Sequence, residues 1–170
     1  WGDPASGSTS SDENSLVNQP SVLFVCLGNI CRSPMAEAAL RARAVEAGIA
    51  VTVDSAGTGD WHVGRPPDRR AIIEAGRHGI DISGYRARQA KAEDFLRFSH
   101  IFALDPQNLR DLQAIAPRRH LARLGLLMDL VPGREGTAVI DPYYGEAEDF
   151  ERAWADVSAA ADVLVGRLGR

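Results

Sequence analysis

The stretch VLFVCLGNICRSP, residues 22–34, decides the fold of this chain. Four apolar residues lead into Cys26, a short loop with glycine and asparagine follows, and a run of strong helix formers begins at Pro34. Proline suits the first turn of a helix, where its missing N–H leaves no hydrogen bond unmade. The stretch therefore predicts a buried strand, a loop and a helix.

This strand–loop–helix unit is suited to binding an anion. The loop turns its backbone N–H groups inward, and the N-terminus of the helix adds unpaired donors and the positive end of its dipole. The guanidinium of Arg32 can grip two oxygens of a phosphate group. Because the same field favours a thiolate, Cys26 is expected to be a nucleophile at neutral pH.

Strand and helix patterns alternate along the rest of the chain. We expect strands over residues 21–25, 51–57 and 99–104, a fourth strand somewhere within 121–131, and helices over 34–47, 68–78, 91–98, 106–115 and from 146 to the end. This order predicts an α/β fold of three layers, a four-stranded parallel sheet flanked by helices, with the phosphate-binding loop after the first strand. Ligands of such sheets bind beyond the carboxyl ends of strands, where Cys26 stands.

The length and composition limit the domain organisation and the partners. With 170 residues, of which 45% are hydrophobic, we expect one domain over residues 21–170. Residues 1–20 are mostly polar, and we predict that they form a disordered tail or are residues added for expression of the protein. The net charge of −4 argues against a nucleic-acid partner, and no apolar run approaches the roughly 20 residues that a membrane span needs.

The cysteines bear on the compartment and on cofactors. Cys26 and Cys31 are the only two, and their place within one loop does not suggest a disulfide framework. They suit a reducing compartment, and with no visible secretory signal we expect a cytoplasmic protein. Because no histidine pattern accompanies them, we expect no metal and no other cofactor.

The motif CLGNICRSPMAE at residues 26–37 resembles the signature of the low-molecular-weight protein tyrosine phosphatases, in which five residues separate a cysteine from an arginine and a serine. A second motif, DPYYG at residues 141–145, also matches, and the resemblance extends from Ser21 to the C-terminus. It implies a phosphoric monoester hydrolase that acts on a tyrosine-phosphorylated protein, with a bacterial tyrosine kinase as one candidate. It also implies a mostly monomeric chain, with a weak dimer as the alternative.

The resemblance implies a role for the residues of the two motifs. Cys26 is the nucleophile that forms a phosphocysteine, Arg32 binds phosphate, and Asp141 is the general acid and then the general base. Because Asp141 must be protonated while the thiol is ionised, we predict a mildly acidic pH optimum. Asn29 tolerates the left-handed backbone that such a loop needs. The other members of the phosphate loop are Leu27, Gly28, Ile30, Cys31 and Ser33.

Residues outside the phosphate loop are implied to support it or to face the substrate. Asp105 follows the third expected strand, where it can support Arg32 and also cap the next helix. Trp61, Tyr143 and Tyr144 are implied to form the walls against the aromatic ring of the substrate.

Three basic residues near these positions are expected to be solvated. His62, the neighbour of Trp61, has no evident partner in the sequence, so we expect it to be solvated. Arg86 and Arg88 lie in a connecting segment and are likewise expected on a solvated loop, with a role in positioning the neighbouring loop as the alternative.

Three alternatives share the anion loop. A protein arginine phosphatase resembles this pattern, although its branch places threonine where this chain has Ile30. An arsenate reductase passes oxidation to further cysteines, and the chain has none beyond Cys31. A binding module without chemistry is the third alternative. We also expect that Cys26 and Cys31 form a reversible disulfide under peroxide, as an equivalent pair can in similar proteins.

Overall fold

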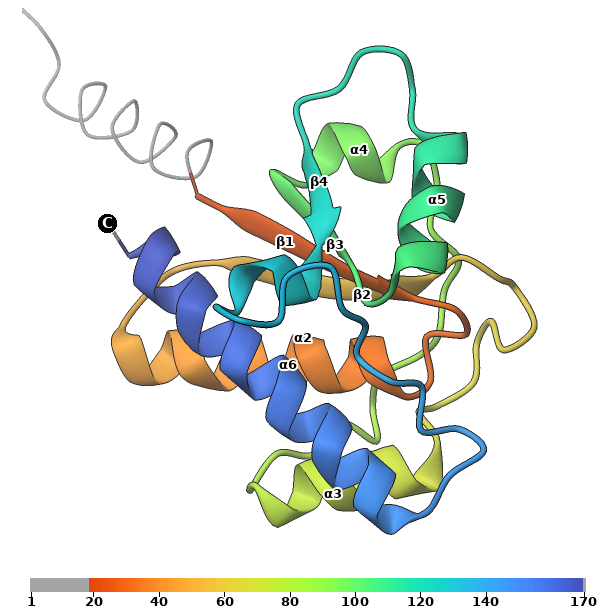
Figure 1. Ribbon diagram of the computed structural model, residues 1–170, viewed down its shortest axis with the longest axis vertical. Coiled ribbons are helices and arrows are strands. Elements are labelled where there is room, and N and C mark those ends of the chain that lie inside the picture. The colour runs from red at the N-terminus through yellow and green to blue at the C-terminus, as the bar shows by residue number, and fades with distance from the viewer. Residues whose placement is uncertain (1–18, 170) are drawn as a thin grey trace, which may run out of the picture.

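The computed structural model describes residues 19–169 of the chain (Figure 1). The predicted tail over residues 1–20 therefore falls outside the described residues, apart from Gln19 and Pro20. The helices and strands, in chain order, are β1 (Ser21–Cys26), α2 (Arg32–Ala47), β2 (Thr52–Gly57), α3 (Arg69–Arg77), α4 (Asp94–Arg97), β3 (His100–Ala103), α5 (Pro106–Ile115), β4 (Arg123–Leu126), the 3-10 helix η1 (Leu127–Leu130) and α6 (Ala147–Leu168).

The four strands form one parallel sheet in the order β2-β1-β3-β4. Figure 1 shows α2, α3 and α6 on one side of this sheet and α4 and α5 on the other. The predicted three-layer α/β fold is therefore confirmed. Within residues 19–169, no helix is both long enough and apolar enough to cross a membrane.

The core explains why β1 lies in the middle of the sheet. Residues 22–25 are buried on both faces, as expected for an apolar strand between two helical layers. On the α2 side, α6 contributes an apolar stripe at helical spacing. Its fully or almost fully buried members are Phe150, Trp154, Val157, Ala161 and Leu164.

Two predicted elements are shorter than expected. The stretch 121–131 holds the expected fourth strand only at Arg123–Leu126, because the chain then turns into η1 and buries Leu127 and Met128. The helix predicted over residues 91–98 contains only Asp94–Arg97. The carboxylate of Asp94 accepts a hydrogen bond from the Lys91 amide at 2.8 Å, so residues 91–93 form a turn before that helix.

Candidate active site

The phosphate loop begins where β1 ends beside β2. Cys26 is paired with Gly57, and the loop stays close to β2 because Thr58 and Gly59 donate hydrogen bonds to the carbonyls of Cys26 and Leu27, both at 2.9 Å. A Cβ atom on Gly57 would lie 2.8 Å from the Leu27 carbonyl oxygen. This approach therefore requires glycine at position 57.

Asn29 determines the path of the loop. Its φ of 58° makes it the one non-glycine residue with a left-handed backbone in the described part of the chain. Its side-chain amide donates to Ser33 Oγ at 2.8 Å and to Ser55 Oγ at 3.0 Å, and its oxygen accepts from the Arg88 amide at 3.0 Å. Asn29 is buried, so these bonds hold the turn in place.

The Cys26 thiol lies inside this loop, almost fully buried. Its sulfur is 3.0 Å from Ser33 Oγ and accepts a hydrogen bond from the Asn29 amide at 3.3 Å. The helix α2 starts at Arg32 and directs its N-terminus at the same loop. Both features favour negative charge on the sulfur.

Arg32 is held from several sides. Its Nη1 donates to Asp105 Oδ2 at 2.7 Å and to the Val139 carbonyl at 3.0 Å, and its Nη2 lies 3.6 Å from Asp141 Oδ2. Burial acts to lower the pKa of Arg32, but the charges of Cys26 and the two carboxylates outweigh it and hold the pKa above its ordinary value. Arg32 therefore stays charged and oriented at the loop.

A cleft of about 270 Å³ opens over these groups. The structure brings most of the predicted site residues to its surface, whereas Asn29, Ser33 and Asp105 lie outside its lining. The lining consists of Cys26, Leu27, Gly28, Ile30, Cys31, Arg32, Trp61, His62, Asp141, Tyr143 and Tyr144.

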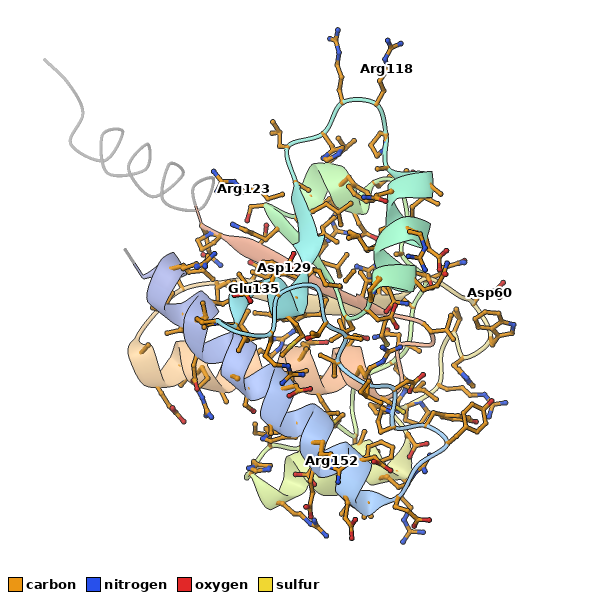
Figure 2. The ribbon with its side chains drawn as sticks, viewed as in Figure 1. Asp60, Arg118, Arg123, Asp129, Glu135 and Arg152 are labelled. Carbon is orange, nitrogen blue, oxygen red and sulfur yellow. The ribbon has the colours of Figure 1, made fainter. Side chains whose placement is uncertain are left out.

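The aromatic walls of the cleft come from two loops. Trp61 lies on the loop after β2, and Figure 2 shows the preceding residue, Asp60, at the outer edge of the molecule. The Trp61 ring lies directly on Gly59, where any Cβ would overlap it. Tyr143 and Tyr144 face the cleft from the loop before α6 and pack edge to face at 4.8 Å.

The structure places His62 at the cleft, which its expected solvation did not indicate. It is half-buried and lines the cleft, and a Cβ on Gly28 would lie only 2.9 Å from its Cδ2. Its ring lies 6.5 Å from that of Tyr143. A histidine beside a predicted wall residue was the available signal, but the contact with Gly28 depends on how the loop folds back over β1.

Arg88 was also misjudged. Besides the hydrogen bond from its backbone amide to Asn29, Arg88 forms ion pairs through its guanidinium with Asp54 and Asp94, each at 3.0 Å.

Sequence reasoning missed Arg70 altogether. It donates to the carbonyls of Tyr143 at 2.8 Å and Gly145 at 3.1 Å. The contacts that tie these two arginines to the site could not be read locally, because Asn29, Tyr143 and Gly145 lie far from them in the chain.

The geometry defines a class of site. A buried thiol at the end of a parallel strand is surrounded by loop amides and an arginine, which together suit the oxygens of a phosphate. A partly exposed carboxyl group, that of Asp141, faces the same arginine from across the cleft. The arrangement is that of a phosphate-monoester site in which a thiol can attack and a carboxyl group can exchange a proton.

Comparison with known proteins identifies the family. The model of the low molecular weight phosphotyrosine protein phosphatases matches residues 21–170, so the chain belongs to this family of hydrolases. It is 43% identical to the low molecular weight protein-tyrosine-phosphatase YfkJ of Bacillus subtilis over 150 residues, 87% of this chain and 95% of that protein. It is 44% identical to the Streptomyces coelicolor low molecular weight protein-tyrosine-phosphatase over 152 residues, 86% and 92% of the two chains.

Solved structures of similar proteins have the same fold as this chain. The crystal structure of Bacillus subtilis YfkJ superposes with a TM-score of 0.82 at 37% identity, covering 89% of this chain and 96% of that one. A Drosophila arginine phosphatase superposes with a TM-score of 0.81 at 32% identity, covering 86% of this chain and 96% of that one. The fold therefore hosts enzymes named for two different phosphorylated side chains.

Proposed function

We propose that the chain hydrolyses phosphotyrosine in proteins through a phosphocysteine intermediate. The observation that carries this proposal is the convergence of the Cys26 thiol, the Arg32 guanidinium and the Asp141 carboxyl group on one cleft. Family membership supports the reaction class, and the names of the Bacillus and Streptomyces relatives support the substrate class.

In the first step, the Cys26 thiolate attacks phosphorus and the bond to the tyrosine oxygen breaks. The loop amides and Arg32 bind the equatorial oxygens and stabilise them more as charge shifts in the transition state. Asp105 and Val139 already hold one edge of the Arg32 guanidinium, so little reorganisation is needed. Asp141 gives a proton to the departing phenolate, which leaves as tyrosine.

In the second step, water attacks the phosphocysteine and Asp141, now ionised, takes a proton from that water. Cys26 departs as a thiolate and phosphate is released. The Ser33 hydroxyl at 3.0 Å and the Asn29 amide at 3.3 Å stabilise the returning negative charge on sulfur. The same two groups therefore serve the nucleophile and the leaving group.

The walls of the cleft favour an aromatic substrate. Trp61 on one side and Tyr143 and Tyr144 on the other present ring surfaces that a phenyl ring can contact. A phosphoserine side chain has no ring to reach these walls. The proposed partner is accordingly a tyrosine-phosphorylated protein, and a bacterial tyrosine kinase remains one candidate.

A second candidate is phosphoarginine hydrolysis, which the likeness to the Drosophila arginine phosphatase favours. The guanidino group is polar and would benefit from a hydroxyl in the loop. In this chain the corresponding lining residue is Ile30, which is buried and offers only hydrocarbon. We therefore rank phosphotyrosine first.

The test is phosphate release from phosphotyrosine, phosphoserine and phosphoarginine peptides, in reducing buffer, by the wild type and Cys26→Ser. We expect release from phosphotyrosine alone and none from the variant. Preference for phosphoarginine would keep the nucleophile but replace the substrate. Release from none of the three would overturn the proposal.

A further inference from the structure

The loop that carries Asp141 is held by one arginine of another element. Arg70, in the first turn of α3, donates from Nη2 to the Tyr143 carbonyl at 2.8 Å and from Nη1 to the Gly145 carbonyl at 3.1 Å. Its guanidinium also lies over the Phe150 ring, 4.6 Å from the centroid. A planar fork with two carbonyl acceptors restricts the loop more than a single contact would.

Arg70 is in turn held by Asp68. The Asp68 carboxylate accepts hydrogen bonds from Arg70 Nε and Nη2, both at 3.0 Å, and caps α3 by accepting from the Arg70 amide at 2.8 Å. The Asp68 amide donates to the Ile30 carbonyl at 2.8 Å. Two residues of one helix start thus connect the phosphate loop to the Asp141 loop.

Asp141 depends on this connection because it has little support of its own. Its side chain is 41% exposed. Among the described residues, its one hydrogen bond comes from the Tyr143 amide at 3.1 Å, and its one ion pair is to Arg32 at 3.6 Å. Since Arg70 binds the carbonyl of that same Tyr143, the place of the carboxyl group follows the backbone that Arg70 holds.

We propose that Asp68 and Arg70 are positioning residues that set the distance between Asp141 and the Cys26 loop. The inference rests on the proposed function, because it assigns these residues to the delivery of the Asp141 proton. Neither residue lines the cleft. Their loss should therefore weaken proton transfer to the leaving oxygen while leaving nucleophilic attack largely intact.

If Asp68 and Arg70 affect proton transfer but not nucleophilic attack, the effect of replacing them should depend on the leaving group of the substrate. The phenolate that leaves phenyl phosphate is a strong base and needs a proton in the transition state. Dinitrophenolate is a much weaker base and departs readily as the anion. The ratio kcat/KM covers the steps up to the loss of the leaving group. If a residue only stabilises the fold, its replacement should lower kcat/KM for both substrates by the same factor.

The experiment compares kcat/KM of wild type and Arg70→Gln on phenyl phosphate and 2,4-dinitrophenyl phosphate. We expect a loss of about tenfold on phenyl phosphate and of less than about twofold on dinitrophenyl phosphate. Asp68→Asn, which can still cap α3, should show the same bias. The double variant should lose little more than either single variant, because both act on one connection.

Arg69→Gln is the matched control. Arg69 is the exposed neighbour of Arg70, and no side-chain hydrogen bond or ion pair joins it to another residue of the range 19–169. The substitution removes the same charge and should change neither substrate. If Arg70→Gln folds poorly, Arg70→Lys keeps the charge without the fork and should show the same bias more weakly.

Equal losses on the two substrates, or no loss on either, would overturn this inference alone. A wild type inactive on both aryl phosphates would overturn the proposed function as well. The two failures are therefore distinguishable from the wild-type rates.

Discussion

Arg32 and Asp105 share a 2.7 Å hydrogen bond between Nη1 and Oδ2, although 73 residues separate them in the chain. The other carboxylate oxygen of Asp105 accepts from the Asn108 amide, also at 2.7 Å, and so caps α5. One carboxylate therefore joins the start of α5 to Arg32. Both roles suggested by the sequence for Asp105 are compatible with this geometry.

Asp105→Asn should separate these two roles. Asparagine can still cap α5, but it removes the charge that orients Arg32. We expect kcat/KM for an aryl phosphate to fall about tenfold, while the free energy of unfolding changes by less than about 1 kcal/mol. Steady-state kinetics and urea unfolding measure the two quantities. A variant with unchanged kcat/KM would show that the contact is only a helix cap.

Replacing Asn29 should show how much the left-handed backbone at this position costs in free energy of unfolding. Asn29→Ala loses three side-chain hydrogen bonds and keeps a Cβ at positive φ, so we expect destabilisation of about 3 kcal/mol. Asn29→Gly loses the same bonds without that strain and should be the more stable of the two. Denaturant unfolding of both variants measures the difference. An alanine variant as stable as the glycine variant would contradict the strain argument.

The buried carboxyl group of Glu37 should make stability depend on pH. Glu37 accepts from Ser55 Oγ at 2.7 Å and pairs with Arg41, yet burial outweighs these contacts and raises its pKa. A raised pKa means that the folded state holds this proton more firmly than the unfolded state. Its contribution is therefore full below the unfolded pKa, about 4.3, and is lost as pH rises through the folded value.

Glu37→Gln removes that titration. The stability of the variant minus that of the wild type should rise with pH across this acidic window and then level off. Thermal or urea unfolding at a series of pH values tests it, with Glu46→Gln, an exposed residue of the same helix, as the control. A difference that falls with pH would mean that the contact with Arg41 outweighs burial and lowers the pKa of Glu37.

Cys31 should protect Cys26 from irreversible oxidation. Both thiols are buried and free, and burial raises the pKa of Cys31, so Cys31 stays protonated while Cys26 reacts with peroxide first. The resulting Cys26 sulfenic acid can condense with the Cys31 thiol, forming a disulfide and releasing water. We expect dithiothreitol to restore activity to the oxidised wild type but not to Cys31→Ala. Mass spectrometry showing sulfinic Cys26 beside free Cys31 in the wild type would refute this prediction.

Local patterns predicted the elements well where they were strong. The helix expected over residues 106–115 has those bounds, because proline opens it and Asp105 caps it. The stretch 121–131 does hold the fourth strand, but its bounds could not be predicted, since an apolar run alone does not distinguish a strand from a short 3-10 helix such as η1. Arg88 failed for another reason: its partner Asn29 lies 59 residues away.

The sequence by itself determined the strand–loop–helix unit around Cys26, because strand, turn and helix preferences are local and the residue types name the chemistry. The tertiary structure alone decided which distant groups complete the site. Arg70 reaches the carbonyls of Tyr143 and Gly145, more than seventy residues onward, only because α3 packs beside α6. Such partners depend on how helices settle on the sheet, and no spacing along the chain encodes them.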